Sequence, residues 1–80
     1  MSLDKIQKEI TKWILKESSE KPKLEQNFLN DNIIDSFKFI SLVVFCEKKF
    51  KIKFDSDDVQ NKNFSTIKVL SELIKKKLNE

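Results

Sequence analysis

The sequence predicts an all-α fold, a small four-helix bundle of three longer helices and one short helix, with a long first loop. The 80 residues contain no Gly and only one Pro, so they are poorly supplied with residues for turns between strands. Apolar residues recur at helical spacing in three segments. Most of these residues are large, which is enough for one core without disulfides or metal. We therefore expect one domain over residues 1–80.

The first segment predicts an amphipathic helix from Leu3 to Glu17. At about 100° per residue, its apolar side chains fall within one narrow stripe and its lysines lie mostly outside it. Ser18, Ser19 and Pro22 then end the helix, because Pro disfavours helical geometry in the residue before it. The stripe consists of Leu3, Ile6, Ile10, Trp13 and Ile14.

Residues 18–35 form a long connection in which apolar residues are scattered among polar ones. A loop of this length must pack on the bundle to be ordered, and such loops often carry function. We expect it to be pinned across the bundle by its apolar residues, which are Leu24, Phe28, Leu29, Ile33 and Ile34.

A second helix is predicted to begin at Asp35 and Ser36, two residues that both suit a helix N-cap, and to run without a breaker to Phe50. It has two apolar stripes on nearly opposite sides, whereas an ordinary surface helix has one. The helix is therefore central in the bundle, or it keeps its second stripe for a partner. The first stripe is Phe39, Leu42, Val43, Cys46 and Phe50, and the second is Phe37, Ile40 and Val44.

The last third of the chain predicts a loop, a short helix and a final helix. In residues 50–54 apolar residues alternate with lysines, as in a strand. A lone strand has nothing to pair with, so a partly buried loop is expected. The polar residues 55–58 supply caps for a short helix around Val59, and Ser65 or Thr66 caps the final helix. The apolar face of that helix is Ile67, Leu70, Leu73, Ile74 and Leu78.

Missing residue types exclude several classes of function. Without His the chain cannot assemble a Ser-His or Cys-His nucleophilic pair, and without Gly it has no phosphate-cradling loop. Its one cysteine, Cys46, excludes an internal disulfide and falls on the core stripe, where it is expected to act as a buried apolar residue. No apolar run is long enough to span a bilayer. We expect a cytoplasmic protein that is not an enzyme, holds no metal and does not insert into membranes.

The net charge of +3 raises the question of nucleic-acid binding. All 16 basic residues are lysines, so the bidentate guanidinium fork that reads guanine edges is missing. The lysines are also spread among 13 acidic residues, as in a solvated surface. A basic nucleic-acid-binding bundle is therefore the least favoured binding class. The acidic residues Asp55, Asp57 and Asp58 resemble part of a calcium loop, but without its Gly and terminal Glu they are better explained as helix caps.

Residues 33–50 read Ile-Ile-Asp-Ser-Phe-Lys-Phe-Ile-Ser-Leu-Val-Val-Phe-Cys-Glu-Lys-Lys-Phe. This segment resembles the signature of acyl and peptidyl carrier proteins, in which Asp-Ser and a large apolar residue open the second helix. Residues 63–67, Asn-Phe-Ser-Thr-Ile, are similar to the segment that leads into the family's final helix. The resemblance covers Leu3 to Leu78 and implies an acyl-carrier-protein-like bundle. For the Asp-Ser pair alone, the plain alternative is that Ser36 only caps a helix.

The resemblance implies that Ser36 is the attachment point of a covalent 4'-phosphopantetheine arm, whose thiol carries an acyl or aminoacyl group as a thioester. Asp35 matches the family residue that assists the phosphopantetheinyl transferase and its magnesium ion. A serine at a helix N-terminus suits a phosphodiester, because the backbone N–H groups and the helix dipole favour negative charge there. The implied partners are this transferase, an acyl-loading ligase or acyltransferase, and downstream synthase enzymes. We expect a monomer.

The resemblance also implies that Phe37, Ile40 and Val44 contact partner enzymes or line an acyl pocket. The second helix departs from fatty-acid carriers, whose acidic second helix docks on basic surfaces, because Glu47 is its only acidic residue and it carries several lysines. That departure favours a stand-alone carrier loaded by an adenylate-forming ligase, or a carrier of secondary metabolism. The alternative from another class is an unmodified helical interaction module that uses the same stripe.

Overall fold

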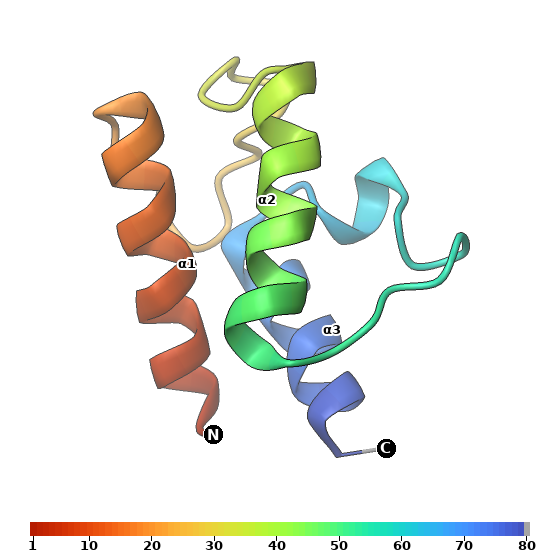
Figure 1. Ribbon diagram of the computed structural model, residues 1–80. Coiled ribbons are helices and arrows are strands. Elements are labelled where there is room, and N and C mark those ends of the chain that lie inside the picture. Colours follow the sequence, from red (N-terminus) through yellow and green to blue (C-terminus); the bar gives the residue numbers. More distant parts are fainter. Residues whose placement is uncertain (80) are drawn as a thin grey trace.

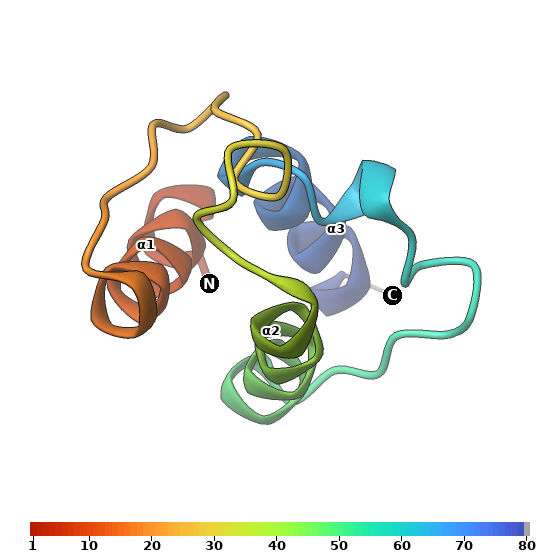
Figure 2. The ribbon, with the colours of Figure 1, turned by 90° about the horizontal axis from the view of Figure 1, so that it is seen from above.

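Three α-helices and one short 3-10 helix make up the protein: α1 (Leu3–Ser18), α2 (Ser36–Phe50), η1 (Asn61–Asn63) and α3 (Ile67–Leu78). They are seen in a computed structural model that describes residues 1–79, with all side chains except that of Asn61. α2 runs in the opposite direction to α1, and the three α-helices surround a common core (Figures 1 and 2). The described residues form no strand. The prediction of an all-α fold is thereby confirmed.

Each α-helix begins at a side chain that accepts a hydrogen bond from an amide of the first turn, which satisfies a backbone donor that the helix leaves free. Where the sequence offered two adjacent candidates, the structure uses Asp35 for α2 and Thr66 for α3. The capping bonds are Lys5 N to Ser2 Oγ at 3.2 Å, Lys38 N to Asp35 Oδ1 at 2.9 Å and Val69 N to Thr66 Oγ1 at 3.0 Å.

Two of the α-helices end at residues in the left-handed region, a position that glycine favours and that this chain must fill with other residues. Ser19 follows α1 with φ of 63°, and its amide donates to Leu15 O at 2.8 Å. Lys51 follows α2 with φ of 55°. α1 therefore ends at Ser18, one residue later than predicted.

The core is formed by one face of each α-helix, and the predicted stripes supply it. Trp13, on the edge of the α1 stripe, is partly buried and stacks on Phe45 with ring centroids 5.6 Å apart. Full burial of a large apolar side chain such as Ile, Leu or Phe stabilises the fold by about 1.5 to 3 kcal/mol. The buried apolar residues of the helices are Ile6, Ile10 and Ile14 of α1, Leu42, Cys46 and Phe50 of α2, and Ile67, Leu70 and Ile74 of α3.

The long first loop is pinned to the bundle through Phe28, which is fully buried. Its amide donates to Ser65 O at 2.9 Å, just before α3, and its carbonyl oxygen accepts from the amides of Ile33 and Ile34, both at 3.0 Å. Ile33 and Ile34 are also buried, so the loop enters α2 in a fixed position. Leu24 behaves differently from the prediction, because its side chain stays 47% exposed.

The second connection comprises residues 51–66. Its first part is a partly buried loop, as predicted for residues 50–54, except that Phe50 still belongs to α2. Ile52 is in the core, and the ring of Phe54 meets Phe64 edge-on at 5.1 Å. Glu47 holds this loop against α2, since its Oε2 accepts from Phe54 N at 2.9 Å.

A short helix was predicted around Val59, but residues 56–60 form turns, and the only short helix in the described part of this connection is η1. Asp55 and Asp58 close the turn reciprocally, each side chain accepting the other's amide at 3.1 Å. Val59 is 36% exposed, so no buried apolar face holds an α-helix there.

Asp58 also binds the end of α3, because its Oδ2 lies 2.5 Å from Lys77 Nζ and both side chains are largely buried. The hydrogen bond from Lys77 holds the pKa of Asp58 below its usual value. A carboxyl whose pKa is lowered by folding stabilises the fold above its unfolded pKa and loses that contribution as pH falls through the folded pKa.

Asp58→Asn is therefore expected to lower the free energy of unfolding by about 1 kcal/mol at pH 7. The difference from the natural chain should shrink as pH falls toward 2, because protonation of Asp58 removes the charge that Lys77 binds. Urea unfolding followed by circular dichroism at the two pH values measures it. Asp57→Asn removes an exposed neighbouring carboxylate and is the matched control; equal losses in both variants at pH 7 would contradict the role given to Asp58.

Candidate functional site

The N-terminus of α2 places Asp35 and Ser36 in different structural roles. Asp35 is the cap residue, with its carboxylate on Lys38 N and its carbonyl oxygen accepting from Phe39 N at 2.8 Å. Ser36 is the first residue of the helix and is exposed. Within residues 1–79 its hydroxyl has no hydrogen-bond partner. Asp35 therefore caps the helix, and the hydroxyl of Ser36 takes no part in the capping.

The backbone on both sides of Ser36 is well held. Before Ser36, Ile34 is buried and its amide donates a hydrogen bond to Phe28 O. After Ser36, Lys38 Nζ donates a hydrogen bond to Glu17 O at the end of α1. These contacts fix the start of α2 against the first loop and against α1. Ser36 therefore presents its hydroxyl to solvent from a rigid position.

A surface hollow of about 560 Å³ lies beside Ser36. Its lining combines apolar side chains with two asparagine amides, the Asp35 carboxylate and the Ser36 hydroxyl. It could seat a ligand with both apolar and amide groups. Its lining is Leu29, Asn30, Asn32, Ile34, Asp35, Ser36, Phe39 and Ile40.

The second stripe of α2 is exposed, which is one of the two alternatives that the sequence left open. Phe37 is 84% exposed, Ile40 63% and Val44 43%. Large apolar side chains with this much exposure, gathered on one helix, are a feature of contact surfaces. The structure thus brings Ser36 and these three residues together along one helix.

The chemistry available to Ser36 is limited to that of a hydroxyl. Its Oγ is hydrogen-bonded to no base in the described part of the chain, so nothing there prepares it to lose a proton. A partner that modified Ser36 would have to supply that base. Such a partner would find the hydroxyl in the field of a helix N-terminus, where backbone N–H groups favour an added negative charge.

Cys46 is not a second nucleophile. It is fully buried, and desolvation, together with the nearby charge of Glu47, raises the pKa of its thiol to about 12. The thiolate is the reactive form, so this side chain is inert in the folded protein.

The acidic residues 55–58 make turn and ion-pair contacts, and the residues described contain no group of His, Cys, Asp or Glu placed to hold a metal ion.

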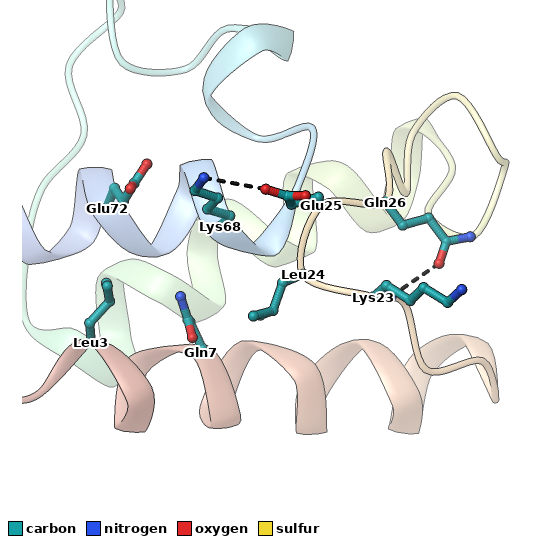
Figure 3. Close-up of a pocket in the computed structure, with 8 residues that line it drawn as sticks. All are labelled: Leu3, Gln7, Lys23, Leu24, Glu25, Gln26, Lys68 and Glu72. Atoms are coloured by element: carbon teal, nitrogen blue, oxygen red, sulfur yellow. Dashed lines mark hydrogen bonds and ion pairs between the residues drawn. The ribbon is translucent and has the colours of Figure 1, made fainter.

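A larger groove, of about 850 Å³, lies between α1, the first loop and α3 (Figure 3). Leu24 projects over it from the loop, while the ion pair of Lys68 with Glu25, at 3.3 Å, ties the loop to α3. On its floor, Gln7 Nε2 donates to Ser71 Oγ at 3.2 Å. The groove shares no lining residue with the hollow beside Ser36.

Sequence reasoning located Ser36, Asp35 and the exposed stripe, but it missed two features. The asparagines of the hollow, Asn30 and Asn32, had no pattern to mark them. The groove of Figure 3 arises from the path of the first loop over α1 and α3, which local periodicity does not encode.

Comparison of the chain with protein-family models, curated proteins and solved structures finds no match. No helix in residues 1–79 is long and apolar enough to span a membrane.

Proposed function

We propose that this chain is an acyl or aminoacyl carrier protein that bears a 4'-phosphopantetheine arm on Ser36. The observation that carries the proposal is that Asp35, and not Ser36, makes the capping hydrogen bond at the start of α2. Asp35 caps the helix, and the adjacent Ser36 hydroxyl is exposed and unbonded. The Asp-Ser-Phe sequence at this position resembles the carrier signature. Under this proposal the fold is carrier-like.

The residues around Ser36 fit the group. A phosphodiester there would lie at the positive end of the α2 dipole, which typically favours such a charge by about 0.3 to 1 kcal/mol. The hollow beside Ser36 offers apolar side chains and the amides of Asn30 and Asn32 to the arm. When attached, the arm supplies a terminal thiol that holds the cargo as a thioester. Asp35 is then the residue that assists the transferase and its magnesium ion.

The partners in this proposal are a phosphopantetheinyl transferase, an acyl-loading ligase or acyltransferase, and synthase enzymes that receive the cargo. They approach α2 from its exposed side, where Phe37, Ile40 and Val44 provide apolar contact. The same exposure also favours the second candidate, an unmodified interaction module that binds partners through this stripe.

Measurement of intact mass distinguishes the carrier protein from the unmodified interaction module. The purified chain is incubated with coenzyme A and a broad-specificity phosphopantetheinyl transferase, beside Ser36→Ala and Ser41→Ala. Ser41 is an exposed serine of the same helix and serves as the matched control. We expect the natural chain and Ser41→Ala to gain one phosphopantetheine group and Ser36→Ala to gain none. No gain by the natural chain with several transferases would leave the interaction module as the better account.

A further inference from the structure

The exposed side of α2 changes character along its length. Phe37, Ile40 and Val44 make its first half apolar, next to Ser36. Lys48 follows on the same side at helical spacing, and Lys51 is the cap residue directly after α2; both are exposed. We call these five residues, Phe37, Ile40, Val44, Lys48 and Lys51, the docking face.

The lysines of α2 and of its C-cap fall into two groups that the sequence does not distinguish. Lys38 donates to Glu17 O, and Lys49 Nζ lies 3.8 Å from Glu9 Oε1, so both are directed to α1. Lys48 and Lys51 make no ion pair within residues 1–79. Their charges are therefore available to a partner.

No acidic side chain of α2 offsets these two charges on the docking face. Glu47 is the only acidic residue of the helix, and its Oε2 is bound to the amide of Phe54 in the following loop. The docking face is thus apolar near Ser36 and cationic at its far end.

We propose that the docking face binds enzymes whose contact surface has an apolar hollow, for Phe37 and Ile40, flanked by carboxylates that meet Lys48 and Lys51. This inference rests on the proposed carrier function and adds the charge of the partner. Opposite charges across such a surface steer association and raise its rate by about tenfold or more at low salt. The first such enzyme is the transferase that modifies Ser36.

An anionic membrane is a poorer occupant of this face. The apolar part consists of three side chains, and the exposed carboxylates of Asp31 and Asp35 lie at that end of α2, where they would repel lipid phosphates. An enzyme surface with an apolar hollow and flanking carboxylates can contact both the apolar and the cationic part of the docking face.

The test uses the phosphopantetheinyl transferase encoded in the same genome as this chain. Initial rates of mass gain are measured from low to physiological salt for the natural chain, for Lys48→Glu/Lys51→Glu and for Lys8→Glu/Lys12→Glu. The last pair is exposed on α1, makes no ion pair in the described residues and changes the net charge equally. We expect a rate that falls with salt for the natural chain, a loss of about tenfold at low salt for the α2 variant, and a change below twofold for the α1 variant.

The possible failures are distinguishable. Mass gain by the α2 variant that equals or exceeds that of the natural chain overturns the acidic partner surface and leaves the carrier function in place. No mass gain by the natural chain, with this transferase or with several broad-specificity ones, overturns the carrier function and this inference with it. Binding to phosphatidylglycerol vesicles that depends on Lys48 and Lys51, with unchanged modification rates, assigns the face to a membrane and overturns the docking proposal.

Discussion

Phe64→Ala is expected to destabilise the fold by about 3 to 5 kcal/mol. Phe64 is fully buried between α2 and the second connection, with ring centroids 5.3 Å from Phe39 and 5.1 Å from Phe54. Truncation removes the contacts of both rings and leaves a cavity that the backbone of a small bundle fills only in part. For a domain of this size, whose total stability is about 5 to 10 kcal/mol, the loss is a large share.

Urea unfolding followed by far-ultraviolet circular dichroism measures the effect. Phe37→Ala is the matched control, because the same residue type is 84% exposed there, and a change within about 0.5 kcal/mol is expected. Phe64→Leu, which keeps part of the volume, should lose about 1 to 2 kcal/mol and provides a folded variant if the alanine variant does not fold. Similar losses for Phe64→Ala and Phe37→Ala would show that the aromatic cluster does not form.

The helices were predictable because each one shows its buried face as a local pattern. Ile6, Ile10 and Ile14 repeat every four residues, and all three are fully buried. Buried side chains in α2 and α3 likewise follow the spacing read from the sequence. Cap residues marked the boundaries, but only the structure shows that Asp35, and not Ser36, forms the capping bond.

Features that depend on contacts between distant segments were not predictable. Lys48 and Lys49 are adjacent in the sequence, yet only Lys49 meets a carboxylate, because Glu9 faces it across the α1–α2 interface. Leu24 looks like a core residue in its loop but remains half exposed over the groove of Figure 3. Near Val59 the predicted helix gave way to turns, since Asp55 and Asp58 bind each other's amides. Each outcome follows from tertiary geometry.

The residues of the candidate site were predictable as a group because they are local in sequence. Ser36, Phe37, Ile40 and Val44 lie on one helix, and helical spacing alone places the last three on a common side. Their exposure could not be read from spacing, since a central helix would have buried both stripes. The three-helix arrangement leaves this side of α2 uncovered by the described residues.

Val44→Glu provides the sharpest test of that surface, since it is expected to slow phosphopantetheine transfer to Ser36 about thirtyfold while the fold stays intact. A charge placed in the centre of the docking face has to be desolvated on contact with an apolar surface, and residues at such centres commonly contribute about 2 kcal/mol to binding. The fold should tolerate the change, because Val44 is 43% exposed and Glu has a higher helix propensity than Val.

Leu15→Glu is its matched control. Leu15 is also 43% exposed and also lies on a helix, α1, but away from Ser36. Initial rates of mass gain and thermal unfolding are measured for both variants, and we expect Leu15→Glu to be modified within twofold of the natural rate. Parallel losses of helicity and rate in Val44→Glu would instead place Val44 in the core. Equal slowing in both variants would show that added negative charge, and not the docking face, controls the reaction.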